Sequence, residues 1–253
     1  MPRPYSALLQ GSTRAKTRSG RCPPAPPASF RASLLTTKIL PTHEPLIRIH
    51  QRDREPLVFS KSVLGNRFDP LPSPWDATEV LYCGSLIETA VAETVLRWHD
   101  QIEPGSQIIL PQSLLTARHV ARFVPRRPLT IIDATALGLA RIREVVARVL
   151  SLPENVERHE SADALPEDIF QCGANDYVQT EQWGAWFRTQ LPRADGLVWI
   201  SRQFNLGRCL VLFADRCSED LQLVEPPKPL YAEGCKERSI VQKMLGQLGW
   251  GVE

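Results

Sequence analysis

The segment LYCGSLIETAVAETV, residues 81 to 95, decides the fold, because in it a short apolar run passes directly into an amphipathic helix. Val80 to Cys83 has the length and composition of a buried strand. Ser85 followed three residues later by Glu88 matches a capping box, which predicts a helix from this point to about His99. A strand that leads straight into a helix indicates a chain that mixes sheet and helix.

Similar short elements are predicted on both sides of this segment. Alternating apolar and polar residues predict a half-buried strand over Leu46 to His50. Further strands are predicted at Gln107 to Leu110, Val120 to Val124, Leu129 to Asp133, Gly196 to Ile200 and Cys209 to Phe213, and helices at about Ala136 to Leu150, Thr180 to Leu191 and Cys235 to Leu248. Residues 152 to 175 read as a long loop or a partly helical excursion. Hairpins with isolated helices and no internal repeat predict the α+β class.

Composition narrows the class of protein. The 253 residues are 43% hydrophobic and 23% charged, as in soluble globular proteins. No apolar run approaches the roughly 20 residues of a membrane span, so we expect no membrane partner. The six cysteines are scattered and the chain shows no secretory signal, which makes reduced thiols and a cytoplasmic location the expectation.

The net charge of +2 conceals an asymmetry along the chain. Residues 1–40 contain seven Arg and Lys and no acid, which leaves −5 for the remainder. We expect 1–40 to be a flexible basic tail, with a targeting peptide or an electrostatic arm for nucleic acid as alternatives. A mildly acidic body argues against direct nucleic-acid binding. We expect a folded domain at 41–225 and a C-terminal linker and helix at 226–253.

Common catalytic motifs are absent from the sequence. It contains no P-loop, no strand-to-helix G-x-G-x-x-G and no H-E-x-x-H, and the five histidines lack metal-ligand spacing, so we expect neither a metal site nor a Rossmann domain. Instead, isolated polar residues stand within apolar segments or beside turns: Arg48, Arg67, Tyr82, Glu93 and Ser201.

Each of these residues also has a structural interpretation. Glu93 and Arg97 are spaced i, i+4, which on most helices gives a surface salt bridge, although Glu93 lies on the flank of the apolar stripe and can face a cleft. Arg48 can be a sheet-face arginine, Arg67 a turn residue, Tyr82 a core tyrosine and Ser201 a strand-end serine.

Together, the order and spacing of these residues resemble the RES domain family, named for its Arg, Glu and Ser positions. The matching segments are Leu46 to Ile49, GNRFDP at 65–70, the opening segment at 81–95, and TEQWGAWFRTQLPRADGLVWISRQFNLGRCLVLF at 180–213, in which Thr180, Asp195, Gly196, Ser201 and Phe213 fit. The family's Gly-Gly-Arg-Trp-Asn-Pro turn has Asn66, Phe68 and Asp69 at three of its positions here. The family's Asn before the last strand is offset, with Asn205 nearby.

The resemblance implies an ADP-ribosyltransferase-like fold over 41–225, with a mixed or antiparallel sheet and flanking helices. It implies a toxin of a bacterial toxin–antitoxin pair that degrades NAD by cleaving the nicotinamide–ribose bond, by hydrolysis or by phosphorolysis with inorganic phosphate as co-substrate. The implied partner is a cognate helix-turn-helix antitoxin. The oligomeric state stays open, a homo-oligomer included.

The residue types suit that chemistry. Glu93 would stabilise an oxocarbenium-like state through the ribose hydroxyls. Arg48 and Arg67 complete the predicted catalytic set and would hold the pyrophosphate, or one of them an incoming phosphate. Tyr82 would stack on nicotinamide or line the ribose pocket, and Ser201 would bind the carboxamide or a ribose hydroxyl. Two alternatives stay open: a protein ADP-ribosyltransferase on the same fold, and a non-catalytic NAD-binding module.

Overall fold

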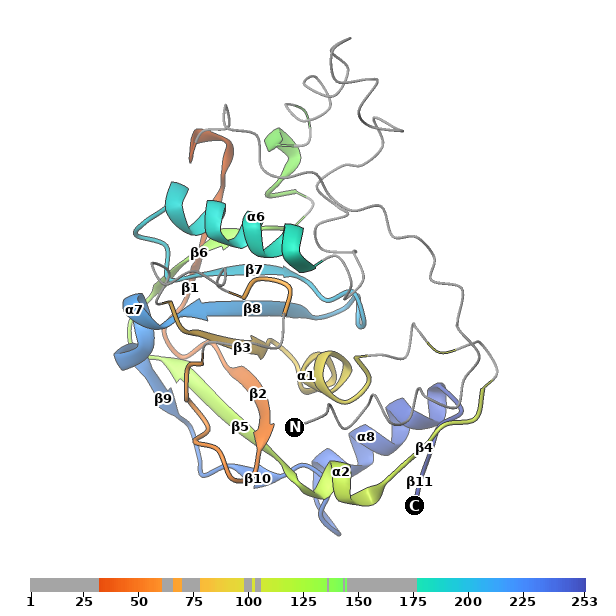
Figure 1. Cartoon of the computed structure of the whole chain (residues 1–253). Coiled ribbons are helices and arrows are strands. Elements are labelled where there is room, and N and C mark those ends of the chain that lie inside the picture. The colour runs from red at the N-terminus through yellow and green to blue at the C-terminus, as the bar shows by residue number, and fades with distance from the viewer. Residues whose placement is uncertain are drawn as a thin grey trace, which may run out of the picture.

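The structure is a computed structural model that describes residues 32–60, 66–69, 78–97, 102, 106–135, 137–142, 144 and 177–253. Its core is a nine-stranded sheet, with a second sheet of two short strands (Figure 1). The elements in chain order are η1 (Ala32–Leu34), β1 (Thr37–Leu40), β2 (Leu46–Gln51), β3 (Val80–Gly84), α1 (Ile87–Thr94), β4 (Ile109–Leu110), α2 (Gln112–Thr116), β5 (Arg118–Pro125), β6 (Leu129–Asp133), α6 (Tyr177–Gln190), β7 (Gly196–Ile200), β8 (Arg208–Phe213), α7 (Ala214–Cys217), η4 (Ser218–Asp220), β9 (Leu221–Leu223), β10 (Lys228–Pro229), α8 (Lys236–Gln247) and β11 (Gly251–Val252).

The large sheet is mixed. Its strands follow the order β1-β6-β7-β8-β3-β2-β5-β10, with β9 pairing to β5 beside this path. The pair β6 and β7 is parallel, while the other ladders of this sheet are antiparallel. Strands β4 and β11 form the small parallel sheet. The predicted α+β class, with a mixed sheet and flanking helices, is therefore confirmed.

Helices cover one face of the sheet. Figure 1 shows α6 lying along β7 and β8, and α1 beside α8. Trp183 and Phe187 of α6 are almost fully buried against the β7 and β8 side of that face, and α1 packs with α8 over β2 and β5. The opposite face carries its own apolar cluster, which includes Leu81 and Cys83 of β3. Burial on both faces explains why Val80 to Cys83 is apolar almost throughout.

Several predicted elements have the bounds found in the structure. The predicted bounds of β6 and β7 agree with the structure at both ends. The predicted bounds differ from the structure by one to three residues at an end for β2, β3, β8, α6 and α8. Helix α1 is shorter than predicted, because it ends at Thr94 rather than about His99. The helix predicted at 136–150 lies largely outside the described residues, and the excursion at 152–175 lies entirely outside them.

The predicted capping box is wrong. The N-cap of α1 is Leu86, and no side chain caps this end. Ser85 instead extends the ladder between β3 and β8: its backbone N donates to the Arg208 carbonyl at 2.9 Å, and its Oγ accepts from the Arg208 backbone N at 3.0 Å. The physical reason is that a neighbouring strand offers Ser85 both a donor and an acceptor, which the local motif does not anticipate.

At both ends of the described chain, the structure differs from the predicted division into a tail, a folded domain and a C-terminal linker and helix. Thr37–Leu40, within the segment predicted as a tail, forms β1 and pairs with β6, where Lys38 Nζ lies 2.7 Å from Asp133 Oδ2. Residues 1–31 lie outside the described residues. Within 226–253, α8 shares an apolar cluster with α1, and Glu237 Oε1 lies 2.6 Å from Arg122 Nη2 of β5. None of the helices described has the length and apolar character needed to cross a membrane.

Candidate functional site

The site begins where α1 meets the end of β7. Ser201, which follows β7 and is fully buried, donates from Oγ to Glu93 Oε1 at 2.6 Å. The same oxygen accepts from the Phe204 backbone N at 2.9 Å. Because the Phe204 N–H already donates to the hydroxyl oxygen, the hydroxyl proton of Ser201 is directed at the Glu93 carboxylate. Two of the predicted residues, far apart in sequence, are thus brought together.

Close packing holds α1 against this loop. A Cβ on Gly207 would lie 1.6 Å from Oγ1 of Thr89, a fully buried residue of α1. Gly207 also donates to the Phe204 carbonyl at 2.9 Å and accepts from the Ser201 backbone N at 2.9 Å. Glycine at 207 therefore lets the loop that carries Ser201 reach the helix that carries Glu93.

A buried thiol adjoins this pair. Cys209 of β8 is 4% exposed and lies next to Ser201 and Glu93, which both act on the pKa of its thiol. Burial first, and then the charge of Glu93, raise the pKa of the Cys209 thiol well above its ordinary value, so the thiol is neutral. The charge of Arg67 acts on the same thiol in the opposite direction. Arg67, itself 7% exposed, is thus within electrostatic reach of the site.

The turn that carries Arg67 rests on the sheet through aromatic residues. The Phe68 ring lies edge-on to Trp199 of β7, with ring centroids 5.0 Å apart. The Phe68 backbone N donates to the Tyr82 hydroxyl at 3.0 Å. Burial, followed by the charge of Asp69, raises the pKa of Tyr82 well above its ordinary value. The hydroxyl of Tyr82 is therefore engaged by the turn.

The structure does not bring Arg48 to this group. Side chains alternate along a strand, so Cys83 points to the face opposite Tyr82. Because Ile47 pairs with Gly84, Arg48 lies on the same face as Cys83. Its Nη1 donates to the carbonyls of Val58 at 2.6 Å and Pro56 at 3.2 Å. Burial lowers the pKa of Arg48 to about 10, which leaves it charged at neutral pH. The predicted joint role of Arg48 and Arg67 conflicts with these opposite faces.

Sequence reasoning missed two acids beside the turn. Asp69 belongs to the predicted turn but has no predicted role, and it is 2% exposed. Glu181 of α6 is 9% exposed, and burial together with the charge of Asp69 raises its pKa to about 7. No sequence pattern marks Glu181, because α6 has only a weak separation of apolar and polar faces.

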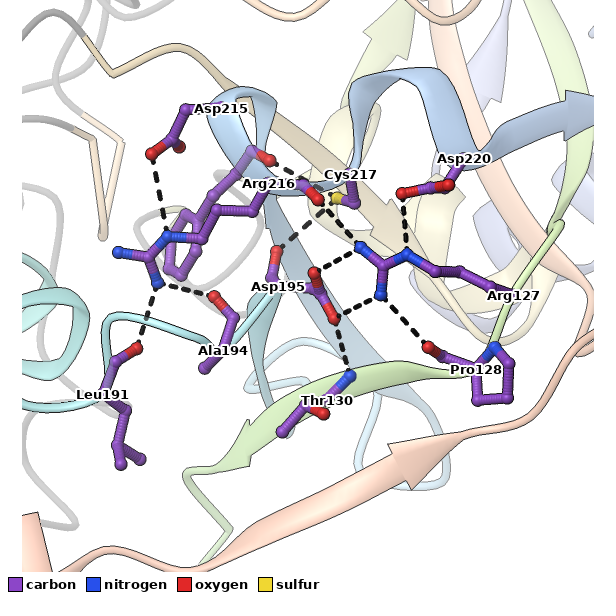
Figure 2. Close-up of polar contacts among 11 residues, drawn as sticks. Arg127, Pro128, Thr130, Leu191, Ala194, Asp195, Asp215, Arg216, Cys217 and Asp220 are labelled. Carbon is purple, nitrogen blue, oxygen red and sulfur yellow. Dashed lines mark hydrogen bonds and ion pairs between the residues drawn. The ribbon is translucent and has the colours of Figure 1, made fainter.

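Asp195 and Gly196, two of the positions that match the family pattern, have structural roles at the opposite end of β7 from Ser201. Asp195 accepts from Arg127 Nη2 at 2.8 Å, from Nη1 at 3.1 Å and from the Thr130 backbone N at 2.7 Å (Figure 2). A Cβ on Gly196 would lie 2.4 Å from the Val211 carbonyl oxygen. These residues join neighbouring strands about 20 Å from Ser201, given about 3.3 Å per residue of strand.

Among the residues that the structure describes, no group of three or more His, Cys, Asp or Glu side chains is arranged to hold a metal ion. The polar groups that the site offers are a carboxylate, a hydroxyl, a neutral thiol and a nearby guanidinium. This set can orient hydroxyl groups and attract an anion.

Comparison with protein families identifies the class of this protein. The family model described as RES domain matches residues 45–231, and the chain belongs to the RES domain family. Among solved structures, a similar chain occurs in the crystal structure of the M. tuberculosis MbcT-MbcA toxin-antitoxin complex, with a TM-score of 0.46 and 16% sequence identity, covering 81% of this chain and 88% of that one. No curated protein matches.

Proposed function

We propose that this protein is a toxin-like enzyme that degrades NAD by cleaving the bond between nicotinamide and ribose. The observation that carries the proposal is the hydrogen bond of 2.6 Å from Ser201 Oγ to Glu93 Oε1, with Arg67 close enough to act electrostatically on the adjoining Cys209. Membership of the RES domain family supports the same substrate.

In the proposed reaction the C1′–N1 bond of NAD breaks and its electron pair leaves with nicotinamide. An oxygen of water or of inorganic phosphate bonds to C1′, and its proton passes to solvent. Glu93 accepts hydrogen bonds from ribose hydroxyls and stabilises the positive charge that develops on the sugar. Ser201 fixes the carboxylate, and Arg67 attracts the pyrophosphate through paired N–H donors. Tyr82 contributes its ring to the pocket while its hydroxyl holds the Arg67 turn.

The test uses purified protein and NAD, with and without phosphate, and resolves the products. ADP-ribose indicates hydrolysis, ADP-ribose-1″-phosphate indicates phosphorolysis, a labelled protein band indicates ADP-ribosyl transfer, and intact NAD indicates a binding module. We expect Glu93→Gln to fold and to lose at least about a hundredfold in turnover, as removal of an electrostatic stabiliser commonly costs. Glu88→Gln, on another side of the same helix, is the matched control.

A second comparison is between variants of Arg67 and Arg48. Arg67→Lys loses the paired donors and is expected to raise the KM for NAD severalfold. Arg48→Lys is the matched control, since its side chain lies on the opposite face of the sheet. Undiminished turnover in Glu93→Gln, or equal effects of the two arginine variants, would contradict the assignment.

The proposal also includes a cognate antitoxin with a helix-turn-helix domain. We expect expression of the chain to arrest bacterial growth and to deplete NAD, and co-expression of a small adjacent reading frame of that type to restore both. Growth arrest without NAD depletion would show that the toxicity does not arise from NAD cleavage.

A further inference from the structure

The turn that carries Arg67 is closed by one buried carboxylate. Asp69 Oδ2 accepts from the Asn66 backbone N at 2.6 Å and from Asn66 Nδ2 at 3.0 Å. The Asp69 backbone N donates in turn to the Asn66 carbonyl at 3.1 Å. Arg67 lies between these two residues, so the bonds made by Asp69 fix the backbone from which the guanidinium projects.

The turn is also tied to the sheet. The hydroxyl of Tyr82 of β3 accepts from the Phe68 backbone N at 3.0 Å, and the charge of Asp69 acts on the same hydroxyl. Trp199 of β7 packs on the Phe68 ring at 5.0 Å and lies 6.4 Å from the Tyr82 ring. The sheet therefore determines where the turn sits, through the backbone N and the ring of Phe68.

Three further elements converge on the turn. Arg97, just beyond α1, donates from Nη1 to Asn66 Oδ1 at 2.7 Å, and its carbonyl accepts from Gln203 Nε2 at 3.0 Å. A Cβ on Gly184 of α6 would lie 3.3 Å from Phe68 Cβ, so the helix touches the turn directly. The turn is thus joined to the end of the helix that carries Glu93 and to the loop after Ser201.

We propose that Asp69 is the positioning residue that holds Arg67 in the orientation from which it meets the anionic part of NAD, acting through its hydrogen bonds with Asn66. This inference rests on the proposed function, since it assigns the orientation of Arg67 relative to NAD. Asp69 itself does not bind the substrate, because its carboxylate is engaged within the turn and would repel a pyrophosphate.

The first test is a double-mutant cycle on NAD cleavage. Asp69→Ala is expected to raise the KM for NAD about tenfold, the usual cost of losing hydrogen bonds to a charged group, with a smaller change in kcat. Asp69→Asn keeps an acceptor for the Asn66 backbone N and should stay within about threefold of the unmodified protein. In an Arg67→Ala background, Asp69→Ala should add less than about a twofold effect.

Equal effects of Asp69→Ala with and without Arg67 would overturn the proposal, because a purely structural carboxylate weakens both proteins alike. Asp53→Ala removes an exposed aspartate in the turn after β2 and is the matched control. If Asp69→Ala does not fold, Tyr82→Phe removes the hydroxyl alone and should raise the KM in the same direction by a smaller factor.

The second test does not depend on activity. The Nε–H resonance of Arg67, assigned by its loss in Arg67→Lys, is compared by NMR in the unmodified protein, in Asp69→Ala and in Asp53→Ala. A shift or broadening confined to Asp69→Ala supports the positioning role, and an unchanged resonance overturns it. If the unmodified protein leaves NAD intact, the proposed function fails while this measurement still decides the role of Asp69.

Discussion

The strongest stability prediction concerns Glu181, whose carboxyl is almost buried beside Asp69. Its pKa is raised from 4.5 to about 7, first by burial and then by the charge of Asp69. An acid with a raised folded pKa binds its proton more tightly in the folded than in the unfolded chain. The free energy of unfolding therefore falls as pH rises from about 4.5 to about 7, by up to about 3 kcal/mol at 1.4 kcal/mol per pKa unit.

The perturbation that tests this is Glu181→Gln, which imitates the protonated carboxyl at every pH. We expect the variant and the unmodified protein to be similarly stable near pH 4.5, and the variant to be more stable at pH 8 by up to about 3 kcal/mol. Urea unfolding followed by tryptophan fluorescence reports on Trp183 and Trp186 of the same helix. Glu219→Gln, at an exposed position in η4, is the control. A stability difference that is the same at both pH values would refute the reasoning.

Two further substitutions test the packing of the sheet and of α1. Gly207→Ala places a Cβ 1.6 Å from Thr89 Oγ1, so we expect a loss of about 1–3 kcal/mol in thermal or urea unfolding, together with reduced NAD cleavage as α1 is displaced. Gly246→Ala, where a Cβ would meet nothing within 4 Å, is the control for Gly207→Ala. An equal change of stability in the two variants would contradict the close contact between Gly207 and α1. Asp195→Asn weakens the paired bond with Arg127 and should cost about 1–3 kcal/mol of stability while leaving the KM for NAD unchanged; a raised KM would contradict its purely structural role.

Much of the fold is predictable where a local pattern and the tertiary structure agree. Leu129–Asp133 and Gly196–Ile200 are strands at their predicted bounds, because each is a short apolar run buried on both faces of a sheet. Two of the strands that the sequence does not predict, β9 (Leu221–Leu223) and β11 (Gly251–Val252), are only three and two residues long. Their strand character comes from the partner that they pair with and leaves little trace in composition.

The sequence singles out Glu93 and Ser201 as candidates, and the structure joins them by a hydrogen bond between two elements that no local pattern connects. Their role in catalysis stays a prediction. The position of Arg48, apart from these two residues, has a simple cause. Leu46, Ile47 and Ile49 are all buried, so β2 has an apolar environment on both faces and its sequence does not show which face Arg48 occupies.

Asn66 and Asp69, the two polar residues that flank Arg67 and Phe68 in the turn, act as one unit. Their side chains are bonded to each other, with Nδ2 of Asn66 3.0 Å from Oδ2 of Asp69. Glycine at 66 would lack the amide that donates to Asp69 and the Oδ1 that accepts from Arg97. Asparagine at 69 would offer one acceptor oxygen where the carboxylate offers two. Asn66 and Asp69 therefore depend on each other, and the turn that carries Arg67 is closed by a hydrogen-bonded pair that neither residue forms alone.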